Sequence, residues 1–170
     1  MDKILTNHLS LNTYSWEFLL FYFCVYSFFG WILENAFNLL VFRNFFKDGF
    51  LFGPFKPMYG FSTVLLLLYS CKYPSWLAIS ALALLIPSSI EFTTAILLKK
   101  FFNLQYWDYT NLRFNFKGYI SLRFCFFWLI LSILGLLFIH PILSFIYYKT
   151  NTIISLLIPV FVSYLSADLF

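Results

Sequence analysis

The sequence predicts an all-α fold, a polytopic membrane helix bundle of about five transmembrane helices with an irregular Gly/Pro loop after the first. Of its 170 residues, 62% are hydrophobic and only 11% are charged, whereas soluble domains average about 25% charged residues. The apolar residues lie in long runs, and most basic residues lie between these runs. We expect a polar N-terminal tail over residues 1–13 and a single transmembrane domain over residues 14–170.

The first two predicted segments differ in length. Residues 14–42 form an apolar run that is long enough to span roughly 30 Å of hydrocarbon with some tilt. Residues 58–71 form a second run, which is short for a span because a helix rises only about 1.5 Å per residue. If this second segment is re-entrant, the orientation of everything after it is reversed.

Three further segments follow. The third covers residues 75–98 and contains Pro87, which is expected to kink the helix or break it. The fourth covers residues 120–139 and is expected to end at His140-Pro141, and the fifth covers residues 152–167.

The basic residues predict how the segments are oriented. If all five segments cross the membrane, the loops 43–57 and 99–119 share one side with the C-terminus. The basic residues of these loops are Arg43, Lys47, Lys56, Lys99, Lys100, Arg113 and Lys117. Those on the opposite side are Lys3, Lys72 and Lys149. The positive-inside rule therefore predicts that the two loops are cytoplasmic and that the N-terminus lies outside.

Several classes of site are disfavoured by the sequence. Cys24, Cys71 and Cys125 are scattered in or beside apolar runs, and their spacing fits neither a disulfide framework nor a metal site. The basic residues fit a membrane orientation signal better than nucleic-acid binding. The sequence contains no Walker A motif and no complete catalytic constellation. We therefore expect no cofactor, no metal and no nucleic-acid partner, and we favour a protein that is not an enzyme.

Glu34 and Glu91 are the strongest site candidates because they are acidic residues inside apolar segments. A charge at the bilayer centre costs roughly 3 kcal/mol or more, so such residues are usually kept for function or pairing. Glu34 lies nine residues before Arg43, and Glu91 lies eight before Lys99. Both acids are therefore expected about 12–14 Å from the same membrane face. There they would suit a substrate path, a proton relay, cation coordination or acid–base chemistry.

A purely structural role is the alternative for both acids. Each would then be paired with a polar neighbour, for packing alone. The candidate neighbours are Asn35, Asn38, Thr93 and Thr94.

Residues 49–60 form the densest irregular stretch, Gly-Phe-Leu-Phe-Gly-Pro-Phe-Lys-Pro-Met-Tyr-Gly. Its glycines and prolines disfavour a regular helix, yet most of its other residues are apolar. We expect a loop that dips into the protein, because irregular backbone at membrane depth must be buried or line a cavity. The candidate site residues are Gly53, Pro54, Pro57, Tyr59 and Gly60. The alternative is a tight structural turn.

Trp107-Asp108-Tyr109 is the candidate motif of the other predicted cytoplasmic loop. Trp and Tyr favour the headgroup level of a membrane. Asp108 between them could orient Arg113 or Lys117, or bind a cation. The alternative is an interfacial aromatic belt with a solvated acid.

Arg43, Lys47 and Lys56 are candidates to contact phosphate or lipid headgroups. Most juxtamembrane basic residues only set the orientation of a membrane protein, which is the alternative for these three.

These motifs occur together in an order that resembles a known family. They are Gly30-Trp31-Ile32-Leu33-Glu34, the stretch 49–60, Glu91, Trp107-Asp108-Tyr109 and Asn115-Phe116-Lys117-Gly118-Tyr119-Ile120. From Phe21 to Pro141 the chain resembles the ABC-transporter type IV family of CmpB-type membrane proteins. The family often has Arg where Lys117 or Tyr119 falls, and Ser where this chain has Thr110.

The resemblance implies a multi-pass protein of the bacterial inner membrane, permease-like and working with a separate ATPase. Because the chain is small for a permease, a homo-oligomer or a partner chain would be needed to enclose a path.

Three functions remain open from the sequence. In the first, which we favour, the chain is a transport-related subunit with Glu34 and Glu91 along the path. In the second, it is a membrane-embedded enzyme that acts on a lipid or lipid-linked substrate at the cytoplasmic face. In the third, it is a small membrane scaffold without a substrate.

Overall fold

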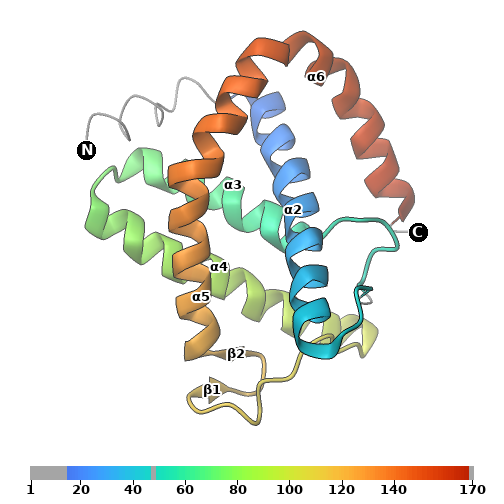
Figure 1. The fold of residues 1–170 in the computed structure, drawn as a ribbon, viewed down its shortest axis with the longest axis vertical. Coiled ribbons are helices and arrows are strands. Elements are labelled where there is room, and N and C mark those ends of the chain that lie inside the picture. The colour runs from blue at the N-terminus through green and yellow to red at the C-terminus, as the bar shows by residue number, and fades with distance from the viewer. Residues whose placement is uncertain (1–14, 47–48, 169–170) are drawn as a thin grey trace.

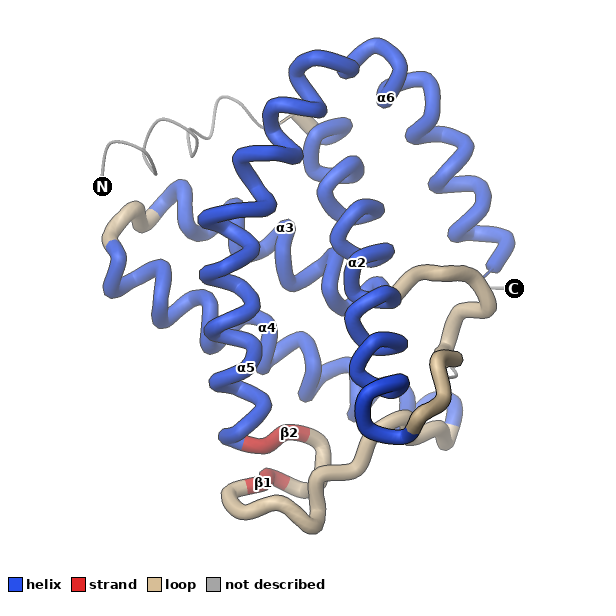
Figure 2. Tube along the Cα trace, viewed as in Figure 1, coloured by secondary structure: helices blue, strands red, loops and turns tan. Residues whose placement is uncertain are grey.

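The computed structural model describes residues 15–46 and 49–168 of the chain. This part is mainly helical, and its one small sheet lies in a loop at the lower end of the view in Figure 2. The predicted all-α fold is therefore confirmed. The predicted polar tail, residues 1–13, lies outside the described residues.

Helix α2 runs over Trp16–Phe42, close to the predicted first segment. Ser15 caps its N-terminus, because the Ser15 side chain accepts a hydrogen bond from the Phe18 N–H. Arg43 ends the helix in the left-handed conformation, with φ of 56°. In that conformation the Arg43 N–H donates a hydrogen bond to the Leu39 carbonyl. One of the last-turn carbonyls, which have no partner within the helix, is thereby satisfied.

Helices α3 (Pro57–Lys72) and α4 (Trp76–Leu97) form an antiparallel hairpin. Pro57 is the first residue of α3, a position at which the missing N–H of proline costs nothing. Pro87 does not break α4, so the expected break is wrong. Ser88 donates to the Leu84 carbonyl at 2.6 Å, and such Ser side chains help to re-satisfy backbone groups near a helical proline.

A short hairpin follows α4. After the π-helical turn η2 (Leu98–Phe102), the strands β1 (Asn115–Phe116) and β2 (Ile120–Ser121) pair antiparallel. The turn between them places Lys117 and Gly118 at φ of 54° and 71°. Two consecutive positive φ values are the requirement of a type I′ turn, and glycine meets this requirement without strain.

The last part of the chain is one long helical run. Helix α5 (Leu122–Leu134) leads through a π-helical turn, η3 (Gly135–Ile139), into α6 (His140–Asp168). The predicted end at His140-Pro141 is therefore wrong. The wider π-helical turn directly before Pro141 gives its ring room beside the preceding carbonyls, so the helix continues.

The interruption of this run lies at Thr150 instead. The backbone of Thr150, with φ of −126° and ψ of 20°, is not helical and forms a kink within α6. The Thr150 hydroxyl donates to the Ile146 carbonyl at 2.7 Å, a back-bond that bends helices. The second half of α6 consequently turns back along the molecule (Figure 1).

Three helical runs in the described residues are long and apolar enough to cross a membrane, so the chain is a membrane protein. They are Trp16–Phe42, Trp76–Phe102 and Leu122–Asp168. The predicted count of five differs from this because α3 has only 16 residues and because the last two predicted segments share one run.

The tightly packed core lies away from the long loops. It joins the N-terminal part of α2 to the end of α3, the start of α4 and the middle of the last helical run. Its fully buried members include Phe18, Tyr22, Leu67, Ile79 and Ala83.

The two loops predicted to be cytoplasmic lie at the same end of the molecule (Figure 1). The Tyr106 hydroxyl of the second loop donates to the Gly49 carbonyl of the first at 3.2 Å. Phe50 also packs edge-on against Phe102, with ring centroids 4.7 Å apart. The turn between α3 and α4 lies at the opposite end.

Candidate functional site

A cavity of about 650 Å³ lies at the loop end of the bundle. Its wall is built by the C-terminal part of α2, the start of α3, Glu91 of α4, most of α5 and the loop residues 106–109. Aromatic and aliphatic side chains dominate the wall, and Glu34, Glu91 and Asp108 supply its carboxylates. The structure therefore brings Glu34 and Glu91, which are 57 positions apart in the sequence, to one cavity.

Glu91 is the most deeply placed of these acids, with 4% of its surface exposed. One carboxylate oxygen accepts from the Tyr109 hydroxyl at 2.8 Å, and the other accepts from the Trp128 indole N–H at 2.9 Å. Phe124 stacks on the Tyr109 ring with centroids 4.5 Å apart. Burial and the neighbouring Glu91 carboxylate raise the pKa of Tyr109 far above its usual value, so this hydroxyl keeps the proton that it donates.

Glu34 belongs to a second group on the facing side of the cavity. Its carboxylate lies 3.5 Å from the Lys56 ammonium, and both side chains are mostly buried. Tyr59 is hydrogen-bonded to Glu34 and packs its ring against Trp128, with centroids 4.9 Å apart. Tyr59 and Trp128 therefore connect the Glu34 group to the Glu91 group. Asn38, one of the polar neighbours considered for Glu34, donates to the backbone carbonyl of Asn44.

Close packing of α2 on α3 fixes the position of Tyr59. Gly30 has the Tyr59 ring where a Cβ atom would stand. Gly60 faces Ser27 and the Phe23 carbonyl in the same way, so glycine at both positions lets the helices approach closely. The Lys56 N–H also donates to the Ser27 carbonyl at 2.9 Å, which ties the end of the Gly/Pro loop to the middle of α2.

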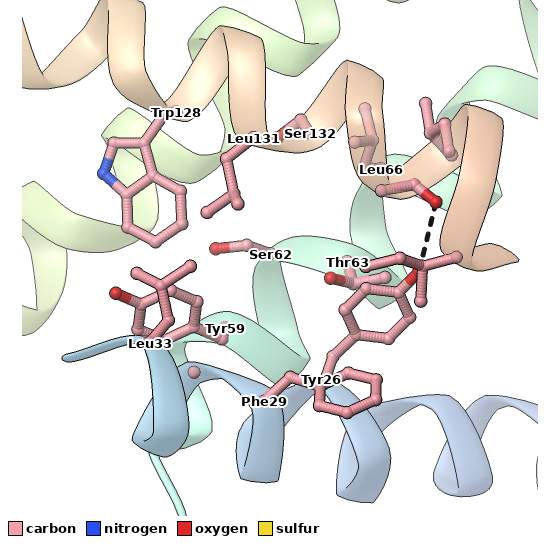
Figure 3. A pocket seen from close by; sticks show the side chains of 14 residues that line it. Tyr26, Phe29, Leu33, Tyr59, Ser62, Thr63, Leu66, Trp128, Leu131 and Ser132 are labelled. Atoms are coloured by element: carbon pink, nitrogen blue, oxygen red, sulfur yellow. Dashed lines mark hydrogen bonds between the residues drawn. The ribbon is translucent and has the colours of Figure 1, made fainter. Parts of the chain in front are cut away.

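A smaller cavity of about 100 Å³ continues from the first toward the packed core (Figure 3). Its wall carries the hydroxyl side chains of Ser62, Thr63 and Ser132. The two cavities share four wall residues, Leu33, Tyr59, Trp128 and Leu131. Figure 3 shows Leu33, Tyr59 and Trp128 together at one end of the smaller cavity. Because these four side chains line both cavities, we call them together the septum.

The Gly/Pro loop packs into the protein through Leu51 and Phe55, which are 8% and 7% exposed. Asp168 at the end of α6 accepts from the N–H groups of Phe52 and Gly53, at 3.1 and 2.9 Å. Gly53 lies close to α6, because a Cβ atom there would stand against the Tyr164 hydroxyl and 3.1 Å from the Asp168 carboxylate. Pro54, next in the loop, is half-buried.

The Trp-Asp-Tyr loop is held in shape by its own hydrogen bonds. The Trp107 indole donates to the Tyr119 carbonyl at 3.0 Å, and Asp108 accepts from the Thr110 N–H at 2.9 Å. Asn115 accepts from the Gly118 N–H and closes the hairpin turn. The described contacts of Asp108 therefore lie within this loop, and its exposed side chain stands at the cavity wall.

The three basic candidates have different surroundings. Lys56 is paired with Glu34, whereas Arg43 is exposed at the end of α2. Lys47 lies outside the described residues. Among residues 15–46 and 49–168, no group of three or more His, Cys, Asp or Glu side chains is placed to hold a metal ion.

Sequence reasoning missed three residues that hold the site together. Trp128 binds Glu91, Tyr106 joins the two loops, and Asp168 holds the Gly/Pro loop. An indole N–H within an apolar helix needs an acceptor, so Trp128 carried a signal that pointed to a buried acid. Nothing in the sequence near Asp168 indicates a contact with residues more than a hundred positions away.

Comparison with known sequences gives one match. The sequence model of the family described as "Putative ABC-transporter type IV" matches residues 21–170. No curated protein and no solved structure matches the chain.

Proposed function

The chain belongs to the family described as "Putative ABC-transporter type IV", and from that premise we propose that it is a transport-related, permease-like subunit with a carboxylate-lined site. The site would lie in the cytoplasmic half of the bundle, in a bacterial cytoplasmic membrane. Glu34 and Glu91 would line the path that the substrate follows.

The observation that carries this proposal is the pair of adjoining cavities. The larger cavity contains the carboxylates, and the smaller one extends from the septum toward the packed core. A buried structural acid needs only donors, whereas a site for a substrate also needs space. A volume of about 650 Å³ falls within the range of roughly 300–1,000 Å³ that is usual for small-molecule sites.

The septum supports a path more than a closed pocket. Tyr59 and Trp128 contact both spaces, and each is bound to one of the acids. A substrate that displaced the Tyr59 or Trp128 hydrogen bond would open the way to the hydroxyl-bearing side chains beyond. We propose that these two side chains form the inner gate.

We propose five membrane segments, which the charge pattern favours. The first three would be α2, α3 and α4, and the kink at Thr150 would divide the last run into two further segments. Both basic loops would then meet the cytoplasm, which supports the proposed orientation. A separate ATPase subunit would dock on this side, and a second copy of the chain would help to enclose the path.

Solute distribution in the native host tests the proposal. Cells that lack the gene would receive the wild-type chain, Glu91→Gln or the matched control Glu17→Gln, whose carboxylate lies in the first turn of α2 outside both cavities. Intracellular and extracellular solutes and membrane lipids would be measured by mass spectrometry. We expect the wild type and the control to change the distribution of at least one solute, and Glu91→Gln to lose that change.

Two outcomes would overturn the transport proposal. One is an unchanged distribution of every solute between wild-type and deletion cells. The other is a new or missing lipid species that depends on Glu91, which would favour the membrane-embedded enzyme instead. Membrane levels of each variant, measured by immunoblotting, separate loss of function from loss of protein.

A further inference from the structure

We propose that the larger cavity binds an amphipathic organic monocation, an aromatic or alkyl compound that carries one ammonium or similar charge. This inference rests on the proposed function, because it names the substrate class of the same site.

The charges of the cavity wall favour a cation. Its carboxylates are those of Glu34, Glu91 and Asp108, and no Lys or Arg stands among the described residues that form the wall. Lys56 is paired with Glu34, and the Arg123 guanidinium lies over the ring of Phe127, 5.7 Å from its centroid. In a partly enclosed space of low dielectric constant, this excess of negative charge attracts a cation more strongly than it would in water.

The aromatic side chains of the wall suit an organic cation. The rings of Phe37, Phe42, Trp107, Phe124 and Phe127 belong to the same cavity wall as the carboxylates. The face of an aromatic ring attracts a cation within about 6 Å, and cages of such rings recognise quaternary ammonium groups. A bare metal ion would instead require a set of oxygen ligands, and the two Glu91 oxygens already accept from Tyr109 and Trp128.

Access to the cavity favours an amphipathic molecule. Phe42, Phe127 and Ile130 line the cavity and are 69%, 49% and 55% exposed, so the cavity is open at α2 and α5. In Figure 1 these two helices stand in front of α3 and α4. If this opening faces lipid in a membrane, an apolar body would enter from the bilayer and its charge would reach Glu91.

Two probes of equal shape and opposite charge test the inference. Tetraphenylphosphonium is the cation and tetraphenylborate is the anion. Their binding to the full-length chain in lipid nanodiscs would be measured by calorimetry and by quenching of tryptophan fluorescence, with empty nanodiscs as the reference. We expect saturable binding of the cation and only bilayer partition of the anion.

Three variants locate the bound cation. Glu91→Gln keeps an acceptor for Tyr109 or Trp128, and should weaken binding about tenfold or more by removing the charge. Phe37→Leu, at another aromatic residue of the wall, keeps an apolar side chain and should weaken binding about threefold. The control Glu17→Gln should bind like the wild type.

Equal saturable binding of both probes would overturn the inference, because the cavity would then recognise only apolar bulk. Equal binding of the cation by the wild type, Glu91→Gln and Phe37→Leu would overturn it as well. If the cation binds as expected while no solute distribution depends on the chain, the proposed function fails and this inference stands. If solute distribution depends on the chain but the cation does not bind, only this inference fails.

Discussion

Tyr109 is the residue that joins a surface loop to a buried acid. Its hydroxyl donates to Glu91, its ring stacks on Phe124, and its backbone N–H donates to the Gly118 carbonyl. Removing a hydrogen-bond donor from a buried carboxylate lowers the stability of a protein far more than removing one from a carboxylate at the surface. Tyr109 is therefore the point at which the loop and the carboxylate site stabilise one another.

Replacing Tyr109 by Phe should lower the free energy of unfolding by about 1–3 kcal/mol, because Glu91 loses one donor while the ring stack on Phe124 remains. The measurement is reversible unfolding in detergent, followed by circular dichroism. Tyr69→Phe, at an exposed position on α3, is the matched control and should change stability by less than about 0.5 kcal/mol.

The pH dependence of that difference gives a second check. The pKa of Tyr109 is raised in the folded chain, so the folded state holds this proton more tightly than the unfolded state. The contribution of Tyr109 is therefore fully present below pH 10.0, the usual tyrosine pKa, and is lost as the pH rises above it. A difference between wild type and Tyr109→Phe that grows above this pH would contradict the assignment.

At the level of elements, the contact of α2 with α3 decides where the polar side chains of both helices stand. Gly60 and Gly30 permit the approach, and the Lys56 N–H bond to Ser27 fixes the start of α3 against α2. Glu34, Lys56 and Tyr59 can contact one another only while α2 and α3 stay this close together.

Gly60→Ala should destabilise the chain by about 1–3 kcal/mol, because the added methyl group meets backbone that cannot move freely. Its Cβ atom would stand 2.6 Å from the Phe23 carbonyl oxygen. Gly135→Ala is the control, since its Cβ atom would meet only the Tyr26 ring at ordinary contact distance, 3.8 Å. Thermal unfolding of both variants would be compared, and equal stability of the two would contradict the proposed close packing.

At the level of the whole molecule, the last turn of α6 holds the Gly/Pro loop that precedes α3. The bend at Thr150 brings the second half of α6 back to the Gly/Pro loop, where Asp168 accepts two backbone N–H groups (Figure 1). Tyr164 packs against Phe55 of the same loop, with ring centroids 5.9 Å apart. The loop that ends at Lys56 therefore depends on α6 for its position.

Asp168→Ala should speed amide hydrogen exchange at Phe52 and Gly53 by about tenfold, because a hydrogen bond to a charged group contributes about 1.5–3 kcal/mol. Asp168→Asn keeps one acceptor and should give an intermediate rate. Exchange would be followed by mass spectrometry on peptides that cover residues 49–56. Unchanged exchange in both variants would show that Asp168 does not hold the loop.

The sequence predicted where the helices lie along the chain better than it predicted how they are arranged relative to one another. The bounds of α2, α3 and α4 lie within two residues of the predicted ones, because apolar runs and capping residues are local signals. Two predicted interruptions were wrong: α4 is not broken at Pro87, the stronger of the two outcomes expected there, and the last run does not end at Pro141. The Ser88 side chain compensates for Pro87 and the π-helical turn compensates for Pro141, and neither is revealed by the proline alone.

Of the candidate site, the sequence by itself determined which charged residues lie in apolar segments, and it predicted their depth in a membrane. Glu34 and Glu91 were predicted at one level, and the structure places both at one cavity. Only the tertiary structure decided that Lys56 pairs with Glu34, that Trp128 binds Glu91 and that Asp168 holds the Gly/Pro loop. The physical reason is that spacing along a helix gives depth, whereas the direction in which a side chain points depends on how the helices cross.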